Sequence, residues 1–290
     1  MKVGFLYSRV RKDEKLLLQE LRDRGHEVKK IDTRELRLGS DDLRTSGDGD
    51  VEVDELDVVV DRAVSYSRGL YAVRYFESYG VPTVNPYETA RVCGNKVETS
   101  LALSDTGVRT PETCVAFTKE SALEAVEEFG YPVVVKPVVG SWARLLAKLN
   151  DREAAEAVLE HKEVLGHYEH SVFYLQNYVE KPDRDVRVAV IGGDAVAAMY
   201  RSSDDWITNA ARGAETTNCE LNAELEKVAL DAAEAVPRGD DAVLGVDMME
   251  TDEGYTVHEV NHTLEFKALT EATGVDVAGA FADHLEEVGA

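Results

Sequence analysis

The chain has 290 residues, of which 44% are hydrophobic, and a formal net charge of −24. This length allows a large core and two or three domains, and no apolar run approaches the roughly 18 residues of a membrane-spanning helix. The excess of acid excludes a protein that binds nucleic acid through a basic surface. Such acidity fits a salt-loving (halophilic) source, because salt screens self-repulsion, or an ordinary acidic cytosolic protein.

Cysteine usage and the start of the chain bear on the cellular compartment. The three cysteines are widely spaced and form no ligand pair or disulfide framework, which fits a reducing cytoplasm. Met1 leads straight into an apolar run without a signal peptide, so we expect a cytoplasmic protein. We also expect a homo-oligomer that has neither nucleic acid nor a membrane as a partner.

The first part of the chain predicts a small parallel-sheet domain, which we place at residues 1–94. An apolar run at 3–8, leucines at helical spacing in 12–24 and a second apolar run at 27–31 form a β-α-β pattern. The pattern lacks a glycine-rich fingerprint, which excludes a dinucleotide site. We expect the polar segment 32–54 to be a surface loop.

The patterns that follow predict short strands that alternate with helices. Pro82 favours an edge position for the apolar residues around it, because proline cannot donate a hydrogen bond to a sheet. Asp151 has the side chain of a helix N-cap. The expected strands lie at 58–61, 111–117, 133–136, 144–149, 172–179, 185–191 and 195–200. The expected helices lie at 66–79, 95–105, 119–129, 151–164, 223–236 and 275–288.

Two lysines occupy positions where a positive charge is unfavourable unless an anion binds to it. Lys136 ends a run of three valines, and an unpaired buried ammonium group is costly. We therefore expect a nucleotide phosphate as its partner. Lys96 opens a helix, where a cation is unfavourable, so it is either a solvated first-turn lysine or a ligand of an anion.

A small loop follows the first of these strands. Gly140 and Ser141 introduce it, and Trp142 and Arg144 are its large side chains. The loop is either a simple turn or a set of backbone N–H groups that cover a phosphate. We expect Trp142 to pack against the protein rather than to stack on a ligand.

A hairpin near the carboxyl end has the composition of a metal site. Strand-like runs at 243–251 and 255–261 flank Asp252-Glu253-Gly254, where glycine permits a tight turn. Glu259 and Asn261 are two residues apart and leave the same face of their strand, and Asp247 can point to that face from the partner strand. Two carboxylates and an amide suit Mg²⁺, whereas the alternative is a half-buried hairpin whose polar residues face water.

The order of these features resembles the ATP-grasp superfamily, and most closely its RimK-like branch with the LysX and ArgX ligases. The closer match lies in the segments Gly140–Ala147 and Glu259–Lys267. The wider match also includes Asn95-Lys96, Val133–Pro137, Gln176–Glu180, Asp185–Arg187, Ala198–Arg201, Trp206–Asn209 and Asp247. The resemblance implies an α/β protein with the ATP-grasp fold, in which a pre-ATP-grasp domain (1–94) precedes a central lid subdomain (95–177) and a carboxy-terminal subdomain (178–290).

The resemblance also implies a role for individual residues. Lys136 and Arg201 would be catalytic, and Mg²⁺, as two ions, would be held by Asp247, Glu259 and Asn261. ATP would contact Lys96, Lys136, Gly140, Ser141, Trp142, Ala143, Arg144, Gln176, Asn177, Tyr178, Val179, Glu180, Arg187, Arg201 and Asn209. The amino-acid substrate would contact Arg201, Asn209, Ala210, Glu265, Phe266, Lys267, Ala268 and Leu269.

The activity implied by the resemblance is ADP-forming ligation in amino-acid biosynthesis. Glutamate or α-aminoadipate would be joined through its amino group to the terminal glutamate of a LysW-type carrier, by way of an acylphosphate. Ala268-Leu269 follows Glu-Phe-Lys, where a bulky residue would shorten the pocket by one methylene, so we expect glutamate, and arginine rather than lysine biosynthesis. Two alternatives are a RimK-like ligase that glutamylates another protein tail and a nucleotide-binding regulatory protein without turnover.

Overall fold

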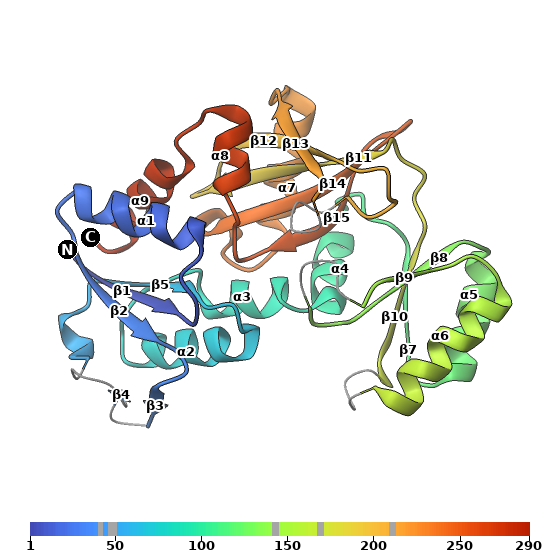
Figure 1. The fold of residues 1–290 in the computed structure, drawn as a ribbon, viewed down its shortest axis with the longest axis horizontal. Coiled ribbons are helices and arrows are strands. Elements are labelled where there is room, and N and C mark those ends of the chain that lie inside the picture. Colours follow the sequence, from blue (N-terminus) through green and yellow to red (C-terminus); the bar gives the residue numbers. More distant parts are fainter. Residues whose placement is uncertain (40–42, 46–50, 141–144, 167–170, 209–212) are drawn as a thin grey trace.

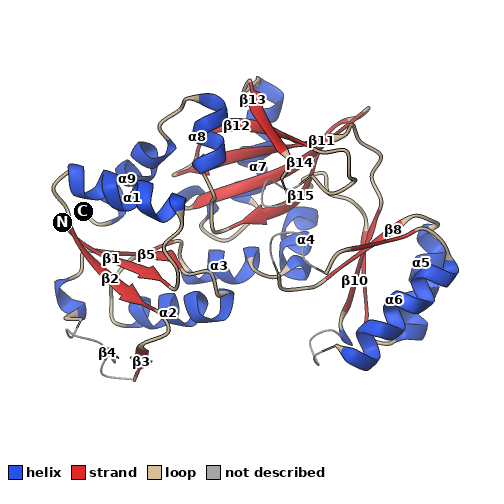
Figure 2. Cartoon of the chain, viewed as in Figure 1, coloured by secondary structure: helices blue, strands red, loops and turns tan. Residues whose placement is uncertain are grey.

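The structure, a computed structural model, describes residues 1–39, 43–45, 51–140, 145–166, 171–208 and 213–290. Within these ranges the chain forms three larger β-sheets and one two-stranded sheet, with helices packed on the larger sheets (Figures 1 and 2). The amino-terminal sheet is parallel, and the other two larger sheets are antiparallel. The fold is therefore mixed α/β, as the sequence predicted.

The amino-terminal sheet has the strand order β2-β1-β5-β6. Its strands are β1 (Lys2–Tyr7), β2 (Glu27–Asp32), β5 (Val58–Arg62) and β6 (Thr83–Val84). Successive side chains of β1 and β5 point to opposite faces, which α1 (Lys12–Asp23) and α2 (Tyr66–Ser78) cover. The expected β-α-β start is confirmed, and β6, which follows Pro82, lies at the edge.

The polar segment 32–54 is not the plain surface loop that its composition predicts. It contains a small hairpin of β3 (Leu36–Leu38) and β4 (Leu43–Thr45). Leu36 and Leu38 alternate with an arginine and pack against the core beneath α2. Two apolar residues at strand spacing are enough to anchor a short ribbon, and the polar residues around them hid this signal.

The central part of the chain forms a second sheet, of order β7-β10-β8-β9, with two helices on one face. Its strands are β7 (Thr113–Ala116), β8 (Val133–Lys136), β9 (Ala147–Leu149) and β10 (Phe173–Asn177). Val133 and Val135 pack on α5 (Lys119–Phe129) and α6 (Arg152–Leu165). The strand period then turns Val134 and Lys136 to the opposite face, toward the third sheet.

The third sheet has the order β13-β12-β11-β14-β15. Its strands are β11 (Arg184–Ile191), β12 (Asp194–Ser202), β13 (Glu215–Cys219), β14 (Val243–Thr251) and β15 (Gly254–Asn261). One face packs on α7 (Ala223–Glu234) and the end of α4 (Lys96–Asp105). The hairpin expected at 243–261 is present, and α3 (Tyr87–Cys93), which the sequence did not predict, precedes α4.

The two closing helices return to the amino-terminal sheet. α8 (Lys267–Thr273) and α9 (Val277–Val288) place Phe266, Leu269 and Phe281 in one core with residues of β1, β5 and β12. Figure 1 shows α9 beside α1, with the two ends of the chain close together. Among the described helices, none is both long and apolar enough to cross a membrane.

Candidate active site

Two cavities meet between the sheets. The first, of about 840 Å³, lies between the second and third sheets. The second, of about 950 Å³, lies between the third sheet and the amino-terminal sheet. Gly140, Arg201 and Glu259 line both cavities, so the two cavities adjoin at these residues.

The outer part of the first cavity is apolar. Its walls carry Val134, Leu146, Tyr178, Val179, Trp206, Ile207 and Met249. The Lys148 ammonium lies 3.6 Å from the centroid of the Tyr178 ring and fixes it from outside. Gln176 and Asn177, at the end of β10, supply polar groups along the same wall. A flat heteroaromatic ring fits this combination of apolar walls and a few strand-end polar groups.

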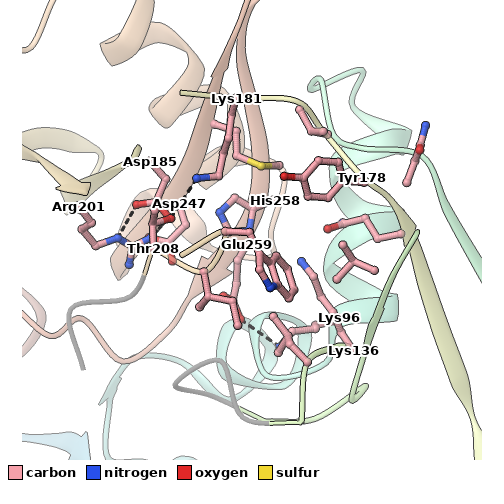
Figure 3. A pocket seen from close by; sticks show the side chains of 18 of the residues that line it. Lys96, Lys136, Tyr178, Lys181, Asp185, Arg201, Thr208, Asp247, His258 and Glu259 are labelled. Atoms are coloured by element: carbon pink, nitrogen blue, oxygen red, sulfur yellow. Dashed lines mark hydrogen bonds and ion pairs between the residues drawn. The ribbon is translucent and has the colours of Figure 1, made fainter. Parts of the chain in front are cut away.

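Lys136 enters the inner part of the first cavity from β8 (Figure 3). The side chain is 7% exposed. Burial lowers the pKa of its ammonium to about 8, and Lys96 adds to this effect. Among the described residues we find no direct hydrogen-bond or ion-pair partner for the ammonium group. A buried cation that lacks a direct partner suits a bound anion.

Lys96 reaches the same space from the first turn of α4. Asn95 caps this helix through its side chain, which accepts hydrogen bonds from the amides of Val97 and Glu98. The Lys96 ammonium donates to the Gly140 carbonyl at 2.9 Å and lies 3.0 Å from the Glu259 carboxylate. Lys96 is therefore held by an ion pair at the junction of the two cavities.

Asp247 is the most strongly paired acid of the site. Arg187 donates two hydrogen bonds to its carboxylate, each of 2.7 Å, and Arg201 lies 3.3 Å away. Burial alone would raise the pKa of Asp247, but the two arginines outweigh this effect and lower it. Asp247 is therefore ionised, and its negative charge is balanced from β11 and β12.

Arg201 belongs to a buried network that the sequence did not predict. Asp185 accepts two hydrogen bonds from its guanidinium, of 2.6 and 2.9 Å. Thr208 donates to the same carboxylate at 2.6 Å, and the Lys181 ammonium donates to the Thr208 hydroxyl at 3.2 Å. All four side chains line the first cavity. Arg201 is thereby fixed in position before any ligand arrives.

A β-bulge on β15 adds a histidine to the site. Asp247 pairs with Glu259, but Met248 pairs with Val257, so His258 is the extra residue. The bulge lets His258 and Glu259 line the first cavity although they are neighbours in sequence. Burial lowers the pKa of His258 to about 4, and Lys136 contributes. His258 is therefore neutral at pH 7.

The metal trio of the sequence analysis is brought together by this hairpin. Asp247 and Glu259 are cross-strand partners, and the Asn261 amide donates to the Asp247 carboxylate at 3.3 Å. No group of three or more His, Cys, Asp or Glu that could hold a metal occurs in the described ranges. The chain thus offers two carboxylates and one amide oxygen, a set that fits Mg²⁺ when phosphate and water complete its shell.

The second cavity is more polar than the first. Among its lining residues are Arg11 and Glu265, which pair with each other, and the third-sheet residues Arg187, Arg201, Glu259 and Asn261. Tyr66 and His262 form part of the wall, with their rings edge to face at 5.8 Å. Burial lowers the pKa of His262 to about 4, with a further contribution from Arg62. With His262 neutral, the charged residues that line this cavity are Arg11, Arg187, Arg201, Glu259 and Glu265.

The structure separates the residues expected to contact the amino acid. Glu265 lines the second cavity, whereas Phe266 and Leu269 are fully buried in the core and Ala268 packs against it. The Lys267 ammonium pairs with Glu271 at 2.8 Å on the surface of α8. Leu269 thus reaches neither cavity, because the turn of α8 directs it to α1 and α9 rather than to the space beside Glu265.

Other expected ligands have varied positions. Glu180, expected to contact ATP, is exposed and lines neither cavity, and the adjacent Lys181 lines the first one instead. Arg187, also expected to contact ATP, lines the second cavity and is bound to Asp247. Ser141, Trp142, Ala143 and Arg144, together with Asn209 and Ala210, lie outside the described residues.

Comparison with known families divides the chain near residue 92. Residues 3–92 match the LysX preATP-grasp domain, and residues 93–285 match the RimK-like ATP-grasp domain. A solved RimK domain protein of the ATP-grasp type, from Sphaerobacter thermophilus, is similar with a TM-score of 0.81 and 28% identity, over 98% of this chain and 99% of that one. An ATP complex of D-alanine–D-alanine ligase from Bacillus anthracis, at 17% identity, shares the fold with a TM-score of 0.71, over 100% of this chain and 97% of that one.

Curated relatives of similar length point in the same direction. The α-aminoadipate–LysW ligase LysX of Sulfurisphaera tokodaii is 36% identical over 99% of both chains. The glutamate–LysW ligase ArgX of the same organism is 29% identical over 99% of both chains. On the strength of these matches over nearly its whole length, the chain belongs to the RimK-like ATP-grasp family of ligases.

Proposed function

We propose that the chain is an ADP-forming ligase that joins the amino group of glutamate or α-aminoadipate to the terminal glutamate of a LysW-type carrier protein. The observation that carries this proposal is the meeting of two cavities at Gly140, Arg201 and Glu259. The first cavity suits a nucleotide, with apolar walls outside and cations inside. The second shares Arg201 with the first and can hold a carboxylate and an amine.

The chemistry follows from this arrangement. The γ-phosphoryl group of ATP passes to the carrier carboxylate, which gives an acylphosphate and ADP. The amine then attacks the acyl carbon and inorganic phosphate leaves. Lys96, Lys136 and Arg201 place positive charge where negative charge gathers, which is what phosphoryl transfer requires of a protein. No side-chain nucleophile takes part.

Magnesium belongs to the proposal as the ion that neutralises phosphate oxygens when bound. Asp247, Glu259 and Asn261 would hold it through their side-chain oxygens. The acids are paired with Arg187, Arg201 and Lys96 in the structure. Binding of Mg²⁺ with ATP would exchange these partners, because phosphates take the cations while the metal takes the carboxylates.

The choice of amino acid is open to both acidic candidates. The steric argument for glutamate assigns Leu269 to the pocket, but this side chain lies in the core. The curated relatives named for α-aminoadipate and for glutamate both cover nearly the whole chain, which supports an acidic amino acid in either case. We therefore propose the class, and leave the preference to direct competition.

Intact mass of the carrier tests the proposal. The full chain is incubated with Mg²⁺, ATP, a LysW-type carrier and an equal mixture of both amino acids, and a carrier that lacks its terminal glutamate is the control. We expect one added amino acid on the intact carrier only, with stoichiometric ADP. ADP formation without a mass gain, or modification of the truncated carrier, would contradict the proposal.

A further inference from the structure

The second cavity is lined by an ion pair that joins distant parts of the chain. Arg11 precedes α1, and Glu265 precedes α8, 254 residues later. The Arg11 guanidinium donates a short hydrogen bond to the Glu265 carboxylate. Both side chains line the cavity and retain some exposure, 21% for Arg11 and 32% for Glu265. A ligand in the cavity therefore meets one charge of each sign.

Arg11 is held from behind by a buried acid. Glu14 accepts hydrogen bonds from two guanidinium nitrogens of Arg11, at 3.1 and 2.9 Å, and from Arg62 at 3.1 Å. The Glu14 side chain is fully buried. Burial alone would raise the pKa of Glu14, but Arg11 and Arg62 outweigh it and lower the value. Because Glu14 holds two of its nitrogens, Arg11 keeps its orientation when the third nitrogen exchanges Glu265 for a ligand.

Glu265 is positioned by the same turn of α1. Asp13 accepts hydrogen bonds from the amides of Phe266 and Lys267, at 2.7 and 2.8 Å. Arg62 donates to the Leu264 carbonyl at 2.9 Å. The residues on either side of Glu265 are therefore fixed to the amino-terminal domain. Such preorganisation lowers the cost of ordering a binding site.

We propose that Arg11 and Glu265 bind the α-carboxylate and the α-amino group of the incoming amino acid. This inference rests on the proposed function and assigns the subsite for the amine substrate. An α-amino acid carries both charges on one carbon, so it can replace the Arg11–Glu265 pair by two new pairs. No buried charge loses its partner in the exchange. A simple amine pairs with Glu265 alone, so Arg11 keeps its ion pair with Glu14 but gains no carboxylate in place of Glu265.

Analogues that lack one group test each residue. γ-Aminobutyrate and 5-aminovalerate are glutamate and α-aminoadipate without the α-carboxylate, and 2-hydroxyglutarate replaces the amino group of glutamate. Dissociation constants are measured by calorimetry on the full chain with Mg²⁺ and a non-hydrolysable ATP analogue. The wild type should prefer the amino acid over the corresponding amine by about 10- to 100-fold, the value of a charged hydrogen bond.

In Arg11→Ala the dissociation constants for the amino acid and the corresponding amine should differ by no more than about threefold, while nucleotide affinity stays unchanged. Glu265→Gln should lose the preference for glutamate over 2-hydroxyglutarate and keep that over γ-aminobutyrate. Arg22→Ala, on the exposed face of α1, is the matched control and should behave as the wild type. Arg11→Gln is measured as well, because a smaller change at the start of α1 preserves the fold if alanine does not.

Several results would overturn the subsite. Equal losses for amino acid and amine in Arg11→Ala and Arg11→Gln would make the pair a structural contact only, and so would unchanged binding. A wild type that binds neither amino acid would reject it too. The carrier assay distinguishes failure of the subsite from failure of the proposed function. If the enzyme modifies the carrier but the Arg11 variants keep the wild-type preference for amino acid over amine, the subsite alone is rejected. If binding of the amino acid depends on Arg11 but the carrier is not modified, the ligation alone is rejected.

Discussion

Arg187 and Asp247 face each other across β11 and β14 and share two parallel hydrogen bonds of 2.7 Å. A metal ion on this carboxylate would add a second positive charge beside the arginine, which favours a new anionic partner for Arg187. Phosphate oxygens are such a partner, and a planar guanidinium binds them in the same forked geometry. Metal and nucleotide should therefore bind together rather than one after the other.

The first prediction concerns Asp247. Mg²⁺ should strengthen nucleotide binding in the wild type, whereas Asp247→Asn should lose this effect and form no ADP, because the amide cannot replace the charge. Glu250→Gln is the control, since Glu250 lies on the same strand, pairs with Arg184 and lines neither cavity. Calorimetry with and without EDTA measures how much Mg²⁺ strengthens nucleotide binding. Formation of ADP by Asp247→Asn near the wild-type rate would reject the metal assignment.

The second prediction concerns Lys136. Its pKa is about 8 without ligand, so the ammonium is protonated at pH 7 and neutral at pH 9. Phosphate binds the protonated form, hence the dissociation constant for ATP should rise above pH 8, by at most about tenfold per pH unit. Lys136→Met should bind ATP weakly and lose this dependence, with a rate reduced by about 10²–10³. Unchanged ATP binding and turnover in Lys136→Met would remove the lysine from the site.

The same lysine affects stability with a definite sign. Its folded pKa lies below the ordinary 10.5, so the unfolded chain binds more protons between pH 8 and 10.5. The contribution of Lys136 to the free energy of unfolding should therefore rise over this range. The difference in urea midpoint between Lys136→Met and the wild type, favouring the variant below pH 8, should shrink toward pH 10.5.

The sequence predicts those features of the site that depend on residues close together in the chain, and it misses those that depend on residues far apart. Three valines before Lys136 predict a buried strand end, and the spacing of Glu259 and Asn261 places both on one face. His258 escaped prediction because a bulge breaks the two-residue period, and no composition rule marks where the extra residue falls. Arg11 escaped it because its partner Glu265 is 254 residues away, and only the tertiary fold brings them together.

At Ala268 and Leu269 the sequence led to the opposite error, in which residues were assigned to the substrate pocket that do not lie there. Ala268 and Leu269 follow a motif of the ligand region, so proximity in sequence suggested proximity to the substrate. The short helix α8 begins directly at Lys267, and the two residues to Leu269 rotate its side chain by about 200° around the helix axis, into the core. Position along a motif therefore did not predict which face of the helix a residue occupies.

The third prediction follows from this burial. Leu269→Ser should lower the free energy of unfolding by about 2–5 kcal/mol, because it removes a fully buried side chain and leaves a cavity. Leu269→Met conserves volume and should cost less than about 1.5 kcal/mol. Urea unfolding measures both. A Leu269→Ser variant of wild-type stability with altered amino-acid preference would return the residue to the substrate pocket.

The fourth prediction concerns salt. The net charge of −24 predicts self-repulsion that salt screens over about 10 Å at 0.1 M and about 3 Å at 1 M. The melting temperature should therefore rise between about 0.1 M and about 2 M KCl. The same titration in the Arg22→Ala variant serves as a control for a single charge. A flat or falling melting temperature would contradict adaptation of this surface to salt.

The core shared by β1 and α9 sets an order of events during synthesis. Val3 and Phe5 of the first strand pack in one cluster with Phe281 and Leu285. The ribosome adds about 5–20 residues per second, so the first strand emerges tens of seconds before the helix that covers it. The part of this apolar face that α9 covers beside α1 therefore stays open for that time, and the shared core is completed only after translation has passed α9.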